Sequence, residues 1–261
     1  MKKTKLLVIM LFVTLMVLIS CGRKVPEGMI FVKGGTFLMG SNDGDGIETP
    51  VHFVTVSDFY IGKHEVIQKE WQEVMVSNPS NFKGDNLPVE RVSWYDAVEF
   101  CNEKSKVEGL TPCYYGSGEN TICDFSANGY RLPTEAEWKY AAKGGTESEN
   151  YKYSGSDSID EVAWYDGNSG DKTHSVGGKQ PNELGIYDMS GNVWEWCNDW
   201  YESYSSNSQT NPRGASSGSY RVFRGGSWRS IAKYCRVAIR YHSRPDYSYN
   251  FLGFRLLRSS K

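Results

Sequence analysis

An excess of positive charge is missing from this 261-residue sequence, which has 29 lysines and arginines against 31 acidic residues and a formal charge of −2. A protein that follows a nucleic-acid backbone needs clustered basic residues, so nucleic acid is not expected as a partner. The four histidines, His52, His64, His174 and His242, lack the spacing of metal ligands, which argues against a zinc site. The sequence also contains no glycine-rich phosphate loop in a strand–loop–helix context, no nucleophile elbow and no internal repeat.

Long apolar runs are also lacking, apart from one that covers residues 6–19 and follows three lysines. This run is short for a membrane span and typical of a signal-peptide core. It is followed by Ser20 and Cys21, which resemble a bacterial lipobox, in which the cysteine is lipidated and becomes the new N-terminus. We therefore expect residues 1–20 to be a lipoprotein signal peptide and residues 21–28 to be a tether anchored in the membrane through Cys21. An ordinary secretory signal with a chance cysteine is the alternative.

Aromatic residues and glycine are abundant, with 8 tryptophans, 17 tyrosines and 27 glycines. Together with a mean hydropathy of −0.52, they predict a loop-rich, soluble mature part whose scattered aromatic side chains fill an irregular core. Few segments have a regular pattern, which would favour disorder, but the density of aromatic residues favours a compact fold. We expect one domain over residues 29–261.

The regular patterns that do occur predict an α+β fold. Apolar spacing predicts helices over residues 63–75 and 93–106, the second with a serine N-cap. A shorter helix is predicted from Thr134, which opens a T-x-x-E capping motif, to the glycine at 144. Strands with glycine turns between them are predicted over residues 29–41 and 50–66.

Five cysteines remain after the lipobox. Cys113 and Cys123 flank a turn between two short predicted strands, where facing positions could carry a disulfide in an oxidising compartment. Cys101 lies in a predicted helix and is expected to be a small buried side chain. Cys197 and Cys235 could be buried thiols or disulfide partners, and the odd number leaves at least one thiol free or paired with another molecule.

A family resemblance rests on seven motifs that occur in order: GGTFLMGS, ETPVHFVTVSDFYIGKHEV, PVERVSWYDAVEFCN, YRLPTEAEWKYAAKGG, NELGIYDMSGNVWEWCNDW, RVFRGGSW and LGFRLL. From Met29 to Leu257 the sequence resembles the formylglycine-generating enzyme (sulfatase-modifying factor) family. The resemblance implies an irregular C-type-lectin-like α+β fold, with one small twisted sheet, two main helices and extensive loops.

The family's catalytic pair is incomplete in this sequence. Oxidases of the family hold copper(I) with two cysteines, five residues apart, after a glycine-glycine-serine turn, because copper(I) prefers sulfur ligands. The matching positions here are Ser230 and Cys235. A hydroxyl cannot replace a soft thiolate, so we expect no copper and no enzymatic activity. Cys235 is then expected to be a core cysteine in a CRVA strand.

A calcium site of the family is better preserved. The resemblance assigns Asp188 and Glu195 as carboxylate ligands and places Gly191 and Val193 where main-chain carbonyls bind Ca²⁺. Asp188 replaces the usual asparagine of the family. In the alternative interpretation, two core tryptophans flank a carboxylate that caps backbone amides. A second calcium site is left unassigned because Trp164 stands at its expected asparagine position.

Residues 221–257 combine a fixed frame with irregular contents. The frame resembles the C-terminal variable region of proteins diversified by retroelements, such as the treponemal variable lipoproteins. In these systems adenines of template asparagine codons are mutated, which cannot produce Lys, Met, Trp, Gln or Glu. Lys233 breaks this rule and would have to be template-encoded. The irregular positions that obey the rule are the predicted ligand-binding residues: Arg229, Ser230, Ile231, Tyr234, Ile239, Tyr241, His242, Ser243, Arg244, Tyr247, Ser248, Tyr249, Asn250 and Phe251.

Three hypotheses on function follow. The first is a non-catalytic lipoprotein, anchored in the bacterial cell envelope and exposed at the outer-membrane surface, whose diversified side chains bind an unknown protein or cell-surface ligand. Tyrosines supply contact area and short polar residues supply adaptable hydrogen bonds, as in an antibody paratope. The second is a copper-dependent oxidase, against which Ser230 counts directly. The third is a passive structural lipoprotein, in which the irregular segment is an ordinary loop with tyrosines packed inward.

Overall fold

The computed structural model describes residues 25–44 and 46–260. The predicted signal peptide and the first half of the tether, residues 21–24 with Cys21, lie outside the described residues. Within the described ranges, no helix combines the length and the apolar character that a membrane crossing requires.

The three predicted helices are present as α1 (Gln68–Val74), α2 (Trp94–Val107) and α3 (Glu135–Ala142), together with a short unpredicted α4 (Ile159–Val162). The predicted caps are also confirmed, because the hydroxyls at the N-caps of α2 and α3 each accept the backbone N–H three residues on. Helix α1 begins later than predicted, because Ile67 forms an antiparallel bridge with Pro88 and so remains extended.

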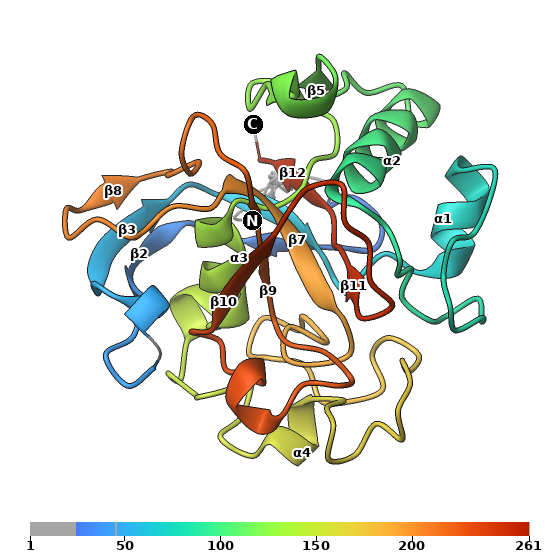
Figure 1. Ribbon diagram of the computed structural model, residues 1–261. Helices are drawn as coiled ribbons and strands as arrows, with labels where there is room; N and C mark the ends of the chain where they lie inside the picture. Colours follow the sequence, from blue (N-terminus) through green and yellow to red (C-terminus); the bar gives the residue numbers. More distant parts are fainter. Residues whose placement is uncertain (1–24, 45, 261) are drawn as a thin grey trace, which may run out of the picture.

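The central sheet has the strand order β10-β9-β7-β11, formed by Arg240–Ser243, Arg221–Arg224, Trp194–Trp200 and Leu252–Gly253. All seven residues of β7 are buried. Figure 1 shows β7, β9 and β10 side by side at the centre, with α3 to their left and α2 to their upper right. The sheet and these two helices therefore enclose the core on which the irregular C-terminal segment rests.

The remaining strands form three smaller sheets rather than parts of the one small sheet that was expected. They have the orders β1-β4-β12 (Met29–Val32, Phe59–Gly62, Leu257–Ser259), β2-β3-β8 (Gly35–Met39, His52–Val56, Gln209–Thr210) and β5-β6 (Tyr114–Tyr115, Ile122–Cys123). Gly34 lies between β1 and β2. The backbone here passes so close to Val56 that a Cβ at this position would lie 2.4 Å from the Val56 carbonyl oxygen, which requires glycine. The chain can therefore bend between β1 and β2. The predicted hairpin is present as β5-β6, and the thiols of Cys113 and Cys123 are both free.

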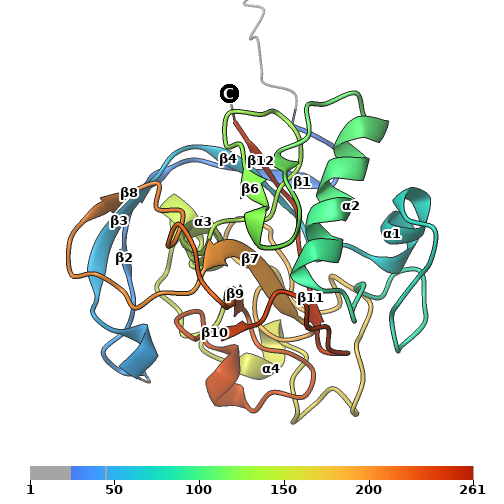
Figure 2. The same ribbon diagram turned by 45° about the horizontal axis from the view of Figure 1, so that its top comes forward.

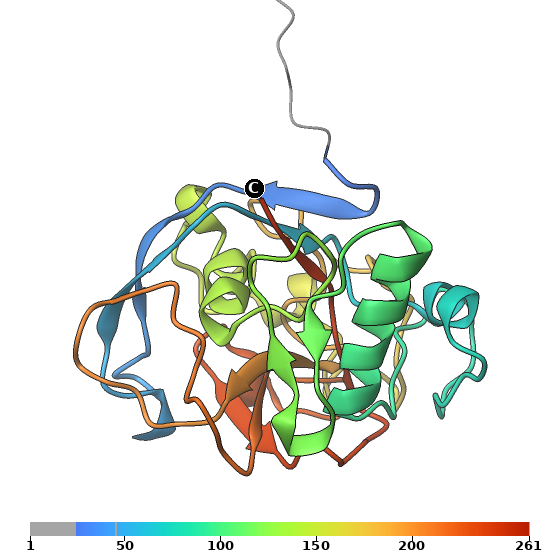
Figure 3. The same cartoon turned by 90° about the horizontal axis from the view of Figure 1, so that it is seen from above.

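The two ends of the described chain meet in one sheet, because β1 and β12 both pair with β4 (Figure 2). Short 3-10 helices occur in the loops: η1 (Gly46–Glu48), η2 (Gly118–Asn120), η3 (Gly145–Glu147) and η4 (Ala232–Cys235). Seen from above in Figure 3, β1 lies at one side of the molecule with the dark red end of the chain beside it, and the orange-red segments of the C-terminal region lie at the opposite side. The irregular segment thus faces away from the point where the chain enters the fold.

Candidate ligand-binding site

A cavity of about 570 Å³ opens on the face formed by β10, η4 and the loop that precedes β11. Three frame residues, Trp194, Phe223 and Ser227, contribute to its wall. The predicted ligand-binding residues that line it are Arg229, Ser230, Ile231, Tyr234, Tyr241, His242, Ser243, Tyr249 and Phe251. The fold therefore gathers nine of the fourteen predicted side chains around one hollow.

The glycine-glycine-serine-tryptophan turn connects the two halves of this face. Gly226 has φ +81°, and a Cβ there would lie 2.7 Å from both the carbonyl oxygen of Tyr234 and Sγ of Cys235. The Ser227 N–H donates to Oγ of Ser230 at 3.0 Å, which fixes the start of the irregular segment. Trp228 donates through Nε1 to the carbonyl of Asn250 at 3.0 Å. The glycine allows the close approach, and the two hydrogen bonds hold the loops on either side of the cavity.

Aromatic rings form most of the cavity wall. The centroid of the Phe223 ring lies 5.1 Å from that of the Trp194 ring and 5.6 Å from that of the Tyr241 ring. The Tyr241 side chain is 50% exposed. Across the cavity, Tyr249 and Phe251 stack at 4.9 Å, and the guanidinium of Arg229 lies 5.1 Å from the Phe251 ring. Such a site can accept an apolar or aromatic group and hold a carboxylate beside Arg229.

Two of the fourteen predicted positions are buried. Ile239 is 1% exposed and belongs to the main hydrophobic core, so the expectation that it faces a ligand is wrong. Ser230 is 7% exposed and contributes to the cavity wall while its hydroxyl is engaged by the Ser227 N–H. The other predicted positions outside the cavity wall are exposed or half-buried: Arg244, Tyr247, Ser248 and Asn250.

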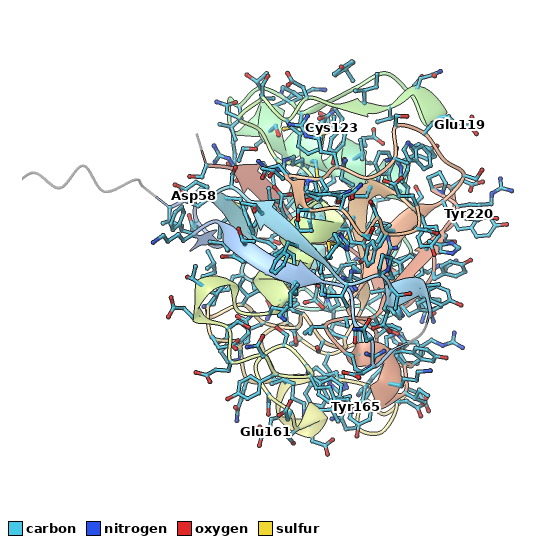
Figure 4. All side chains as sticks on the ribbon, turned by 90° about the vertical axis from the view of Figure 1, so that its left-hand side faces the viewer. Asp58, Glu119, Cys123, Glu161, Tyr165 and Tyr220 are labelled. Carbon is cyan, nitrogen blue, oxygen red and sulfur yellow. The ribbon has the colours of Figure 1, made fainter. Side chains whose placement is uncertain are left out.

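Other residues of this face were missed by the sequence prediction. Trp194 and Phe223 sit in strands whose pattern indicates core residues, and nothing in the sequence shows that one edge of each ring borders a cavity. Tyr220 directly precedes β9, is 44% exposed, and its ring lies 4.9 Å from that of His242. Figure 4 shows Tyr220 and Asp58 at opposite edges of the molecule. Tyr220 therefore extends the aromatic face beyond the fourteen predicted positions.

The positions of the family's copper cysteines do not form a thiolate pair. Cys235 is fully buried, and burial raises the pKa of its thiol to about 12. Its predicted burial in the core is confirmed, but Cys235 ends the 3-10 helix η4 and does not lie in a strand. At the other position, the Ser230 hydroxyl interacts with Ser227 through a contact of 3.1 Å between the two Oγ atoms. These contacts offer no pair of soft ligands for copper(I).

The predicted calcium positions are buried, but the contacts of Glu195 do not fit a calcium ligand. Its carboxylate accepts hydrogen bonds from Nε and Nη2 of Arg255 and from Nε1 of Trp138, all at 2.6 Å. A cation would have to displace this guanidinium, which already neutralises the carboxylate. In this arrangement Glu195 is the ion-pair partner of Arg255 and does not fit its predicted role as a calcium ligand, while the main-chain positions Gly191 and Val193 stay predictions. Calcium binding stays a prediction for direct titration.

Asp188 differs from Glu195, because its Oδ2 accepts the Gly177 N–H at 2.7 Å while its Oδ1 has no hydrogen-bond partner in the described structure. Burial raises the pKa of Asp188 to about 6. Both carboxylate oxygens of the neighbouring Glu65 are also buried without a hydrogen-bond partner, and burial, with the charges of Asp188 and Glu195, raises its pKa well above the usual range. Arg255 therefore acts as the counterion of a buried acidic cluster.

Comparison with known proteins identifies the family and several relatives of this chain. Residues 19–260 match the family described as sulfatase-modifying factor enzyme 1-like domain. The chaperone protein LppX of Paenibacillus barcinonensis is 41% identical over 84% of this chain and 85% of its own length. The formylglycine-generating enzyme of Thermomonospora curvata is 30% identical, over 89% of this chain and 94% of its own length. Chlamydial serine/threonine-protein kinases such as that of Chlamydia caviae, 33% identical over 89% of this chain, are longer, and the chain spans 38% of their length.

Among solved structures, Treponema denticola variable protein 1 superposes with a TM-score of 0.83 at 39% identity, covering 89% of this chain and 95% of that protein. The predicted α+β fold and the resemblance to treponemal variable proteins are thus confirmed. The chain belongs to the formylglycine-generating, sulfatase-modifying factor family and has the fold of its variable-protein members.

Proposed function

We propose that this protein is a non-catalytic, lipid-anchored binding protein of the bacterial surface, whose cavity between η4, β10 and the loop before β11 holds a protein ligand. The observation that carries the proposal is the convergence of nine predicted variable side chains on one aromatic-lined cavity. An ordinary loop with tyrosines packed inward would not leave Tyr241 and Tyr247 at 50% and 43% exposure.

The geometry supports binding of a protein group with an apolar body and an acidic neighbour. Tyrosine and phenylalanine rings offer contact area at a small cost in rotamer entropy, and Arg229 offers a cation at the rim. Substitution on this face leaves the turn and the buried strands in place, so ligand specificity can change without loss of the fold.

The absence of catalysis is supported by the two cysteine positions of the family. Ser230 supplies a hydroxyl, and the high pKa of Cys235 keeps its thiol protonated. In a test for the oxidase alternative, the protein would be incubated with copper(I), oxygen and a cysteine-containing sulfatase peptide. We expect no formylglycine; its formation would contradict the proposal.

The direction of the chain agrees with a surface anchor. The described chain begins on the side opposite the proposed binding face (Figure 3). A tether attached before β1 would therefore present the cavity away from the membrane. Labelling with palmitate, together with a Cys21→Ala variant that loses the label and the membrane fraction, tests this part of the proposal.

The first experiment is to sequence the DNA downstream of the gene. A near-copy of the codons for residues 221–257, with asparagine codons at the irregular positions and a reverse transcriptase gene beside it, supports a diversified binding protein. Neither feature being present would favour a passive envelope protein instead.

The second experiment concerns the cavity itself. The protein without residues 1–20 would be tested against a panel of purified surface proteins, alongside a Tyr241→Ser/Tyr249→Ser variant and a Tyr115→Ser control. Tyr115 is exposed to a similar extent as Tyr241, at 57% against 50%, but it lies on the β5-β6 hairpin and outside the cavity. We expect the double variant to lose binding at least tenfold and the control to retain it. Equal binding by all three proteins would reject the cavity as the site.

A further inference from the structure

A second cavity, of about 780 Å³, borders the end of α3. Its wall comes from residues 40, 41 and 43 after β2, from Lys139 and Lys143, from residues in the 150–157 loop and from residues 232, 233 and 236–238 in and after η4. In Figure 1 the lower end of α3 lies between η1 and η4. The wall includes none of the fourteen predicted ligand-binding positions, so this cavity is separate from the proposed protein-binding site.

Positive charge dominates the described wall of this cavity, where five basic side chains stand against two acidic ones. The basic residues are Lys139, Lys143, Lys152, Lys233 and Arg236, and the acidic residues are Asp43 and Asp157. The carboxylate of Asp157 accepts the backbone N–H of Lys152 at 2.8 Å, and Arg236 forms an ion pair with the buried Glu48. Arg236 is thus paired, whereas Lys139 and Lys143 form no salt bridge with a carboxylate in the described part of the chain.

Lys139 is buried with one neutral acceptor. Its side chain is only 2% exposed, and Nζ donates to the carbonyl oxygen of Gly40 at 2.8 Å. Among the described residues, no carboxylate lies within ion-pair distance of this ammonium, which has three N–H groups to satisfy. Burying a charge is costly unless a counterion and hydrogen-bond acceptors compensate it. An anion in the adjoining cavity would supply both.

The pKa of Lys139 agrees with an incompletely compensated buried amine. Burial lowers it well below the usual range, the positive charges of Arg224 and Lys143 lower it further, and the more distant carboxylates of Glu135 and Glu48 offset only part of this effect. Burial also lowers the pKa of Lys143, which is half-buried beside the same cavity. Both lysines would bind a proton more tightly with an anion between them.

We propose that this cavity binds an oxyanion, the phosphate or sulfate group of a small ligand, through the ammonium groups of Lys139 and Lys143. Lysine suits this role because its compact charge accepts any orientation of a tetrahedral oxyanion. The buried Lys139 holds the group at the base of the cavity, and the more exposed Lys152 lies at the entrance.

The test compares thermal unfolding in inorganic sulfate, inorganic phosphate and chloride at equal ionic strength. Sulfate stabilises most proteins through exclusion from their surface, so the informative quantity is the difference between variants. A Lys139→Met/Lys143→Gln variant removes both ammonium groups, and Lys69→Gln on α1 is the matched control, because Lys69 is exposed and lies outside the cavity wall. We expect sulfate and phosphate to raise Tm for the wild type and the control by several degrees more than for the double variant.

Calorimetric titration with phosphate gives the second readout. Lys143→Gln, at a half-buried position that tolerates the change, should weaken binding at least fivefold, while Lys69→Gln should leave it unchanged. Equal Tm gains in all proteins, or equal phosphate affinity for Lys143→Gln and the control, would overturn the site. Titration with a phosphate monoester and with a sulfated disaccharide shows whether the oxyanion of the ligand is a phosphate or a sulfate group. Binding that requires phosphatidylglycerol vesicles would overturn the proposal of a small ligand.

Discussion

Replacing Arg255 by methionine should be among the most destabilising single changes in this protein. The guanidinium is fully buried and donates from Nε and Nη2 to both carboxylate oxygens of Glu195 at 2.6 Å. Nη1 also donates to the carbonyl of Gly62 at 3.0 Å, and Nη2 to that of Tyr187 at 2.9 Å. Arg255→Met therefore leaves one buried carboxylate without its counterion and two carbonyls without their donor.

The magnitude follows from these contacts. Removing one partner of a buried ion pair costs about 3–5 kcal/mol, and each carbonyl that loses its donor adds about 1 kcal/mol. We expect a total loss of about 5–7 kcal/mol near pH 7, which is a large part of the roughly 5–15 kcal/mol that holds a typical domain folded. The loss should be smaller at pH 5, because the carboxylates left without a counterion can then take up protons.

Urea unfolding followed by tryptophan fluorescence measures this loss. A Glu195→Gln/Arg255→Met double variant is the control, because glutamine has no charge and its side-chain oxygen can still accept the Trp138 N–H. We expect the double variant to recover at least about 2 kcal/mol relative to Arg255→Met. A loss below about 1 kcal/mol for Arg255→Met, or no recovery in the double variant, would refute the role of Arg255 as the counterion.

Two further predictions concern pH and the irregular segment. Glu90 is fully buried, with Oε2 lacking a hydrogen-bond partner, and burial raises its pKa to about 7. Because this folded-state pKa lies above the unfolded one, the contribution of Glu90 to stability is full below about pH 4.5 and is lost as pH rises through 7. The wild type should therefore lose about 2 kcal/mol of unfolding free energy between pH 5 and pH 8 that the Glu90→Gln variant does not lose. Ile231→Ser, at a 52% exposed position, should change stability by less than about 0.5 kcal/mol, whereas Ile239→Ser, in the core, should cost about 3 kcal/mol. Chemical unfolding of each pair of proteins checks these values, and similar losses for the two serine variants would contradict the division between exposed and core positions.

Local interactions explain which parts of the fold the sequence could predict. The caps at Ser93 and Thr134 involve residues three positions apart, so the starts of α2 and α3 were predictable. The start of α1 was not, because it depends on the bridge between Ile67 and Pro88. The strand and turn patterns likewise predicted β1 to β4 and the β5-β6 hairpin, but neither the four strands of the central sheet nor the division into four sheets.

Burial and distant ion pairs explain where the site prediction failed. The codon argument identifies positions that can vary in a gene, but it contains no information on exposure. Strand alternation would leave one of two adjacent residues outside, yet Ile239 and Arg240 are both buried, because Arg240 forms an ion pair with Glu135 inside the protein. The partner of Glu195 lies in the final motif of the sequence, and no local pattern links the two.

In the sheet β1-β4-β12, the pairing of the last strand depends on how the irregular segment before it folds. Strand β12 follows the irregular segment in the sequence, and its residues 257–259 pair with β4 when the segment between them has brought the two strands together. A variant whose altered residues block that folding would leave one edge of β4 unpaired. An unpaired strand edge favours aggregation and proteolysis, so substitutions within residues 221–257 that prevent this pairing are expected to lower the yield of folded protein.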